Sequence, residues 1–354
     1  MSRFRLGELF CGPGGIAHGA VTAKIADPDF QIIHQWATDY DKDTCNTFVH
    51  NICQGKEGSV VWKDIRKLDM ETLAEIDALA FGFPCNDYSI VGEQKGMDGV
   101  YGPLYSYGIK ALKKFKPKWF LAENVGGLRN ANDGKAFEQI LNEMRSAGYT
   151  LTPHLYKFEE YGIPQARHRI IIVGVKNNEN VIFKVPSTSL RVRTDNSCRT
   201  AIEKPPIAKD APNNELTNQS PTVVERLKHI KAGENAFNAE LPEELKLNVT
   251  GAKISQIYKR LDPNKPAYTV TGSGGGGTHI YHWTEPRALT NRERARLQTF
   301  PDTYVFQGSK ESVRKQIAMA VPCDGARIIF EAILNTFAEI SYDWIEANIK
   351  QQGG

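Results

Sequence analysis

Short apolar segments of strand length alternate with segments of helical period through the first half of the chain. Residues 4–10 form the first apolar segment, and a glycine-rich stretch at 11–15 separates it from a helical segment at 16–25. Further strands are expected at 32–38, 78–83, 119–122, 149–158 and 169–175, and further helices at 41–51, 104–115 and 135–146. This alternation predicts an α/β fold with a mostly parallel sheet and helices on both faces.

The pattern changes at Pro186. From there to residue 286 the chain is rich in proline, asparagine, threonine and glycine, with short strand-like pieces and one helical segment near 222–229. We interpret this stretch as a second, smaller, irregular and mostly-β domain. Helical segments return at 290–299, 312–318 and 324–340, and the apolar face of the last predicts packing on the first domain. The expected domains are therefore 1–185, 186–300 and 301–354.

The composition is that of an ordinary globular protein, with 41% hydrophobic and 24% charged residues in a chain of 354. No apolar run reaches the roughly 18 residues of a membrane helix, and no leader or lipidation signal is recognisable, so we expect no membrane association. The net charge is only +3, but residues 186–300 hold 17 lysines and arginines against 12 aspartates and glutamates. This local surplus favours a polyanionic partner for the second domain.

The six cysteines do not follow a metal-binding or disulfide pattern. None forms a CxxC pair, the spacing typical of zinc sites, so we expect no metal. Their scatter indicates a reduced, intracellular compartment.

The glycine-rich stretch after the first strand predicts a nucleotide-type ligand. Gly12, Gly14 and Ala17 fit the G-x-G-x-x-G/A fingerprint, in which backbone amides at a helix start approach a ligand closely. The next strand ends at Asp39-Tyr40, where a carboxylate can bind ribose hydroxyls and an aromatic ring can stack on adenine. A tight turn with a capping aspartate would show the same residues. A nicotinamide dinucleotide and S-adenosylmethionine both remain open at this point.

Polar groups follow other strands where each strand ends. Cys85 lies just past the strand at 78–83, preceded by proline and followed by polar residues and a glycine-spaced loop at 86–102, which are the conditions for a presented nucleophile under a lid. Glu123 follows the strand at 119–122, and Arg167 and Arg169 precede the strand at 169–175. Taken singly, a buried thiol, a helix cap and structural arginines would explain them equally well.

Together and in this order, these motifs resemble the C5-cytosine-specific DNA methyltransferase family of the bacterial restriction-modification type. The resemblance rests on Pro84-Cys85, Glu123-Asn124-Val125 and Gln165-x-Arg167-x-Arg169, and it extends to blocks at 287–302 and 316–322. It covers residues 5–175 and 287–335, while 186–285 carries no matching sequence.

The resemblance implies a Rossmann-like, S-adenosylmethionine-dependent methyltransferase fold with a target-recognition domain at 186–300. Cys85 matches the nucleophile that adds to C6, Glu123 the residue at N3 and N4 of the base, and Arg169 the arginine at O2, with Arg167 helping to hold that site. The residues that match the S-adenosylmethionine site are Phe10, Gly12, Gly14, Gly15, Asp39, Tyr40, Asp64 and Ile65. Two departures are Glu8, where many members have aspartate, and Ala318-Met319, where the usual pair is Gly-Asn.

The implied activity is that of a DNA (cytosine-5-)-methyltransferase acting on a cytosine flipped out of double-stranded DNA. We expect a cytoplasmic bacterial monomer, with a cognate restriction endonuclease acting separately. An RNA cytosine-5 methyltransferase of the same fold and a catalytically silent DNA-binding relative are the alternatives. Lys253, Lys259, Arg260 and Lys265 are candidates for phosphate contacts, and the glycine run 272–277 is either a close-approach loop or a flexible linker.

Overall fold

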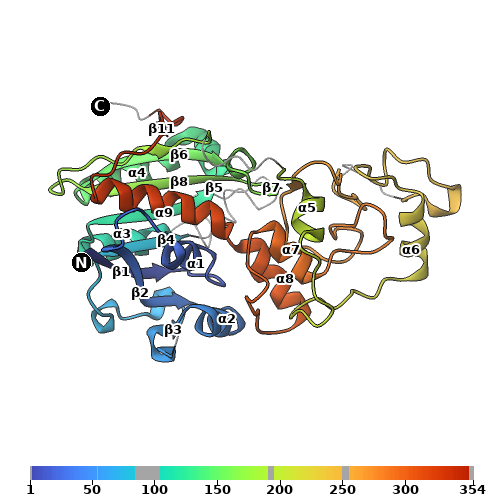
Figure 1. Cartoon of the computed structure of the whole chain (residues 1–354), viewed down its shortest axis with the longest axis horizontal. Coiled ribbons are helices and arrows are strands. Elements are labelled where there is room, and N and C mark those ends of the chain that lie inside the picture. The colour runs from blue at the N-terminus through green and yellow to red at the C-terminus, as the bar shows by residue number, and fades with distance from the viewer. Residues whose placement is uncertain (1, 54, 84–103, 190–194, 249–254, 351–354) are drawn as a thin grey trace. The chain divides into compact units, whose positions relative to one another are not determined.

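A computed structural model describes residues 2–53, 55–83, 104–189, 195–248 and 255–350 (Figure 1). The chain divides into two compact units. Unit 1 comprises Met1–Lys157, His168–Arg191 and Cys323–Gly354, and unit 2 comprises Phe158–Arg167 and Val192–Pro322.

A seven-stranded sheet in the order β3-β2-β1-β4-β5-β8-β6 forms the centre of unit 1. All neighbouring pairs are parallel except those of β8, which runs antiparallel to both β5 and β6. The mostly parallel sheet predicted from the sequence is therefore confirmed. Its strands are β1 (Ser2–Leu9), β2 (Phe30–Asp39), β3 (Val60–Trp62), β4 (Ala78–Gly82), β5 (Trp119–Val125), β6 (Tyr149–Lys157) and β8 (His168–Lys176).

Helices cover both faces of this sheet, because alternate strand residues are apolar on each side. On one face, Phe81 and Phe120 pack among the apolar residues of two helices, α3 and α4. On the other, Phe4 meets Trp119 and Phe337 edge-on. The helices of unit 1 are α1 (Gly15–Thr22), α2 (Lys42–Ile52), α3 (Tyr105–Phe115), α4 (Lys135–Ser146) and α9 (Cys323–Phe337).

The last helix returns to the sheet, as the sequence predicts. Helix α9 lies against α1 (Figure 1), where a Cβ atom added to Gly19 would stand 2.6 Å from the Cβ of Ala326. Glycine thus allows the two helices to approach closely. Beyond α9, β11 (Trp344–Ile345) pairs antiparallel with β9 (Val185–Pro186), which fixes the end of the chain to the same unit.

Unit 2 is irregular, with short helices joined by long loops. Its helices are α5 (Cys198–Glu203), α6 (Pro221–Lys228), α7 (Asn291–Leu297) and α8 (Lys310–Met319). In its described part, strand structure is confined to the two-residue pair β7 (Gln165–Ala166) and β10 (Ala267–Tyr268) and to isolated bridges, so the expectation of mostly-β content is wrong. Buried polar groups replace a regular sheet in holding its loops.

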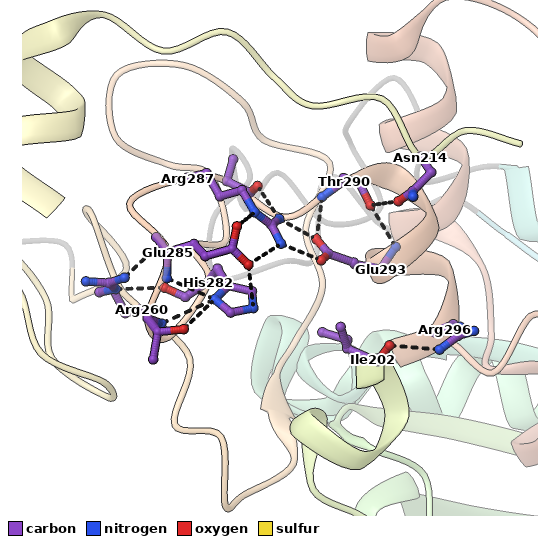
Figure 2. A network of polar contacts seen from close by, with 11 residues as sticks. Ile202, Asn214, Arg260, His282, Glu285, Arg287, Thr290, Glu293 and Arg296 are labelled. Atoms are coloured by element: carbon purple, nitrogen blue, oxygen red, sulfur yellow. Dashed lines mark hydrogen bonds and ion pairs between the residues drawn. The ribbon is translucent and has the colours of Figure 1, made fainter. Parts of the chain in front are cut away.

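A network around α7 shows how these loops are held (Figure 2). Thr290 and Glu293 form a capping box at the start of the helix, and Arg287 donates to both oxygens of Glu293 at 2.8 Å. Arg260 donates to the main-chain carbonyls of Leu227, Ile230, His282 and Glu285 at 2.7–2.8 Å and is 4% exposed. Arg260 therefore stabilises the interior of unit 2, and the prediction that it contacts a phosphate is wrong.

The boundaries of the units differ from those of the expected domains. Residues 301–322, expected with the C-terminal helices, belong to unit 2, so α8 and α9 lie in different units. The segment Phe158–Arg167, expected in the first domain, also belongs to unit 2. Its Phe158 amide bonds to the Arg167 carbonyl at 3.1 Å, which closes it into a compact loop.

Candidate functional site

The sheet of unit 1 brings the expected site residues of that unit to one edge. In the sheet, β2 lies on one side of β1, and β4 and β5 lie on the other. The carboxyl ends of β1 and β4 therefore form the topological switch point, where open α/β sheets bind ligands. The antiparallel β8 starts at this same edge. Consequently the residues after β1, β2, β4 and β5 and the first residues of β8 lie together.

The turn after β1 is tightly wound and is braced by Asp39. Phe10, Gly12 and Gly14 all have positive φ angles, of 55°, 56° and 94°. The Gly12 amide donates to Oδ2 of Asp39 at 3.0 Å, and the Cys11 amide donates to the Thr38 carbonyl at the same distance. The end of β2 thus fixes the turn that leads into α1.

Both carboxylate oxygens of Asp39 accept hydrogen bonds from main-chain amides. Its Oδ1 accepts the Asp41 amide at 3.0 Å, while Asp41 caps α2 by accepting the Thr44 amide at 2.8 Å. Burial raises the pKa of Asp39, and the backbone hydrogen bonds oppose that shift. The sequence predicts a ribose ligand here, and the structure adds a second role, that of holding two loops together.

Two exposed aromatic residues flank this position. Tyr40 is 72% exposed and Trp62 is 57% exposed, which leaves the Tyr40 ring accessible for stacking. The Trp62 indole donates from Nε1 to the Tyr40 carbonyl at 2.9 Å, so β3 fixes the backbone under that ring. The sequence analysis missed both β3 and Trp62, because three residues give no periodic signal.

Asp64 and Ile65 follow directly after β3. Asp64 caps the next turn by accepting the Arg66 amide at 2.9 Å and forms an exposed ion pair with the Arg66 guanidinium. Those bonds lower the pKa of Asp64 to about 2. Ile65 is buried at 6% exposure, so it fixes the position of this turn.

Glu8 is the functional candidate that sequence analysis undervalued. It lies next to the last residue of β1, paired in register with Ala37 and Ala80, and is 1% exposed. Neither of its carboxyl oxygens has a hydrogen-bond partner among the described residues. Burial and the nearby Asp39 raise its pKa well above the usual range. An acid inside the apolar segment Leu6–Phe10 was the available signal.

The structure brings Glu123 and Arg169 together. Oε1 of Glu123 lies 2.9 Å from Nε of Arg169, and both side chains are mostly buried. They come from adjacent strands: Glu123 pairs with Ile171 of β8, and Arg169 pairs with Val125 of β5. Gly82 of β4 is paired with Glu123 of β5. A Cβ atom added to Gly82 would stand 3.1 Å from Oε2 of Glu123.

Asn124 ties the ends of β4 and β5 together. Its side-chain amide donates to the Phe83 carbonyl at 3.2 Å, and its Oδ1 accepts the Val125 amide at 2.8 Å. Asn124 is 3% exposed, so both bonds are shielded from water. Phe83 is the last described residue before the expected nucleophile, and Cys85 itself lies outside the described residues, as does the expected lid at 86–102.

The position of Arg167 differs from the one that we expected, beside Arg169. Its guanidinium belongs to unit 2, where it donates to the carbonyl of Ala318 at 2.8 Å, and it is 1% exposed. The two arginines therefore have their contacts in different units, because the segment before β8 folds into unit 2. The Ala318 contact uses the main chain, so it places no demand on the side chains that depart from the usual Gly-Asn.

The fold and this edge define a Rossmann-like methyltransferase. The crystal structure described as a prophage-encoded DNA modification methyltransferase from Escherichia coli has the same fold, with a TM-score of 0.71 at 22% identity over 94% of this chain and 99% of its own.

Sequence comparison gives the family. A family model for C-5 cytosine-specific DNA methylases matches residues 4–335. The type II methyltransferase M.BbvI of Brevibacillus brevis is 59% identical, over 98% of this chain and 94% of its own length. The type II methyltransferase M.NgoFVII of Neisseria gonorrhoeae is 37% identical, over 97% and 89%. The chain belongs to the C-5 cytosine-specific DNA methylase family.

The protein is therefore a DNA cytosine-5-methyltransferase that uses S-adenosylmethionine, and the family resemblance inferred from its motifs is confirmed. This excludes a nicotinamide-dependent enzyme and makes DNA, rather than RNA, the substrate. Among the described residues, no helix is both long and apolar enough to span a membrane.

Proposed function

We propose that Glu123 and Arg169 hold the flipped cytosine while Cys85 attacks it. The observation that carries this proposal is the Glu123–Arg169 ion pair at the carboxyl edge of the sheet. A carboxylate can accept hydrogen bonds from the N4 amine and from a protonated N3, and a guanidinium can donate to O2. The two side chains thus offer the acceptor and the donor that the Watson–Crick edge of cytosine requires, on strands fixed by main-chain hydrogen bonds.

The attack by Cys85 makes C5 of the cytosine nucleophilic. Its thiolate adds to C6, and the ring electrons move toward C5 and N3, where Glu123 favours the protonated nitrogen. C5 then acts as the nucleophile toward the methyl group. Loss of the C5 proton to a base or water and elimination of the thiolate restore the aromatic ring, so Cys85 is regenerated.

The residues around β1 and β2 fit S-adenosylmethionine. The bound cofactor would supply an electrophilic methyl group on a positively charged sulfur. The methionine part carries positive charge, and the orphaned carboxyl of Glu8 is the group that lacks a partner here. Phe10, Gly12, Gly14 and Gly15 would hold the methionine end, Asp39 the ribose, and Tyr40, Asp64 and Ile65 the adenine.

The remaining expectations concern the organisation of the enzyme. We propose that residues 186–300 read the target sequence and that the protein is a cytoplasmic monomer, the modification partner of a separate restriction endonuclease. The similarity to type II methyltransferases and the positive surplus of this region support this proposal. Methylation of a random-sequence DNA library, followed by bisulfite sequencing, would give the target sequence.

Trapping on modified DNA tests the role of Cys85. Duplexes that carry 5-fluorocytosine at the target should form a covalent complex with the wild-type enzyme, because no C5 proton can leave. Cys85→Ser should form none, since a hydroxyl is far less ionised than a thiol at neutral pH. Cys53→Ser, a change at another cysteine, should still trap. A covalent complex formed by Cys85→Ser would show that another residue is the nucleophile.

A further inference from the structure

The glycine run 272–277 in unit 2 is a packed loop and not a flexible linker. A Cβ atom on Gly274 would collide with the guanidinium of Arg314, and one on Gly277 would stand 2.5 Å from the ring of Tyr258. The Gly277 carbonyl accepts the Tyr258 amide at 2.7 Å, and the Gly275 carbonyl accepts the Thr278 amide at 2.9 Å. The run is therefore fixed at several points along its length.

The outer part of the same loop is bare backbone. Residues 273–276 are exposed, and a Cβ atom on Gly275 or Gly276 would meet nothing within 4 Å. The amide groups of residues 273–276 donate no hydrogen bond to any described residue. A surface on which Ser273 carries the only side chain, with unused donors, allows another molecule to approach the backbone directly.

Arg314 of α8 lies directly beneath this loop. Its side chain is mostly buried, with 9% of the residue exposed. Its Nε donates to the Gly272 carbonyl at 3.1 Å, and neither of its terminal nitrogens has a hydrogen-bond or carboxylate partner among the described residues. The guanidinium is thus held in place by one bond, with its two outer nitrogens available.

A second arginine, Arg294 of α7, adds to the positive charge. It is 1% exposed, its Nη1 donates to the Thr271 carbonyl at 3.3 Å, and its Nε has no partner in the described structure. Burial and the charge of Arg314 lower the pKa of Arg294 to about 10, so Arg294 is protonated near neutral pH. His279, 3.4 Å away, has a pKa lowered to about 4 and is neutral.

Two other arginines of unit 2 are paired with carboxylates, whereas Arg260 and Arg292 are held by main-chain carbonyls. Arg287 pairs with Glu285 and Glu293 (Figure 2), and Arg296 pairs with Asp302. No described carboxylate forms an ion pair with Arg294 or Arg314. Two neighbouring buried cations repel each other and are costly to desolvate, so this arrangement favours the binding of an anion.

We propose that Arg314, supported by Arg294 and covered by the glycine-rich loop of residues 272–276, binds a phosphate of the DNA backbone. The proposal rests on the DNA substrate and on the proposed role of residues 186–300, which include the glycine run, in reading DNA. The exposed amides and the guanidinium would share the phosphate oxygens, an arrangement that positions the duplex without reading its sequence. Glycine at 274 is required because any side chain there would displace the guanidinium.

The salt dependence of DNA binding tests this site. The affinity of the full-length protein for a duplex would be measured by fluorescence anisotropy at several salt concentrations. Arg314→Gln should bind about tenfold more weakly and should reduce the slope of log K against log salt by about 0.9, the value for one lost phosphate contact. Lys315→Gln is the matched control: it removes an exposed, Glu311-paired lysine of the same helix and should leave the slope near the wild-type value.

Two further measurements make the test decisive. Gly274→Ala keeps the charge but displaces the guanidinium, so it should weaken DNA binding as Arg314→Gln does, and it replaces that variant if Arg314→Gln does not fold. Duplexes with single methylphosphonate substitutions should reveal one phosphate whose neutralisation weakens wild-type binding but not that of the variant. An unchanged slope in both variants would overturn the proposal.

Free anions provide the alternative outcome. If inorganic phosphate raises the melting temperature of the wild type but not of Arg314→Gln, while the salt slopes for DNA coincide, the site binds free anions and the DNA contact is refuted. Failure of the wild type itself to bind or methylate DNA would contradict the proposed function instead. S-adenosylmethionine affinity should be the same in every variant, because no residue of the cofactor site is changed.

Discussion

Glu123 and Arg169 form an ion pair across two antiparallel strands although they are not directly opposite each other. Glu123 faces Ile171, and Arg169 faces Val125, so the pair is diagonal, with a distance of 2.9 Å between Oε1 and Nε. Nη1 of Arg169 also donates to the main-chain carbonyl of His168 at 2.7 Å, which fixes the guanidinium beside Glu123. In the absence of a base, each side chain compensates the charge of the other in a site that excludes most water.

Glu123→Gln should therefore slow methylation far more than it weakens DNA binding. Glutamine can accept from N4 but cannot stabilise a protonated N3, so a loss of about 10² in kcat is expected. Single-turnover rates with a target duplex, measured beside equilibrium binding, separate the two effects. Wild-type turnover in this variant would remove Glu123 from the reaction. Arg169→Lys tests the partner, because a lysine keeps the charge and loses the fork of donors.

Even the conservative replacement of Asp39 by asparagine should weaken cofactor binding. Both of its oxygens accept main-chain amides, from Gly12 and Asp41, and an asparagine can offer only one oxygen. Asp39→Asn and Asp39→Ala should each weaken S-adenosylmethionine binding by about 1–3 kcal/mol, the scale for lost bonds to a charged group. Calorimetric titration measures this directly. If asparagine bound the cofactor as tightly as aspartate, the brace between β1 and β2 would be unnecessary for the site.

Glu8 should make cofactor binding depend on pH. Its pKa is raised by burial and by Asp39, so the free enzyme holds a proton there that a bound cation would expel. Affinity for S-adenosylmethionine should rise with pH, by at most about 1.4 kcal/mol per unit, until the free protein loses this proton. Calorimetry in buffers of different ionisation enthalpy should detect proton release on binding. In Glu8→Gln that release should disappear.

The same shift has an opposite effect on the stability of the free protein. The unfolded chain releases this proton near pH 4.5, and the folded chain keeps it to a higher pH. Stability of the cofactor-free enzyme should therefore fall as pH rises through that window, with a smaller fall in Glu8→Gln. Urea unfolding at several pH values measures it. Asp39, whose pKa is also raised, is present in both proteins and contributes the same background.

Gly19→Val should destabilise unit 1. Its Cβ would stand 2.6–2.7 Å from the Cβ of Ala326, the Arg327 nitrogen and the Cys323 carbonyl oxygen, so α9 would have to move. Overpacking of this kind costs about 1–3 kcal/mol, and the better helix propensity of valine returns less than 1 kcal/mol. Gly58→Ala, where a new Cβ meets nothing within 4 Å, is the control. Equal unfolding midpoints for the two variants would contradict the close contact.

The sheet of unit 1 could be predicted from the sequence because its strands and helices are long and periodic. The motifs also placed Glu123 and Arg169 at strand ends, and the structure shows that their strands are neighbours. The position of residues 158–167 in unit 2 could not be predicted, since in sequence they resemble a short connection between two strands. For the same reason the sequence predicts Arg167 beside Arg169.

Burial explains the other differences. Arg260 and Arg314 are both arginines in a positively charged region, and only the structure shows that one is satisfied by four carbonyls and the other by one. Glu8 differs from the expected aspartate by one methylene group, but its lack of a partner depends on Ala37 and Ala80 in the neighbouring strands. Such features depend on residues distant in sequence, and local patterns do not report them.

The discontinuous path of the chain has a consequence for biosynthesis. Unit 1 is assembled from three segments, and α9, which covers one face of its sheet, comes from the last of them. A ribosome must therefore synthesise the chain as far as residue 337 before α9 can cover the apolar face of β1, whereas domains made of one early segment fold as they emerge. Until then one face of that sheet would stay open to water, and methylating capacity would arise only after α9 has been made.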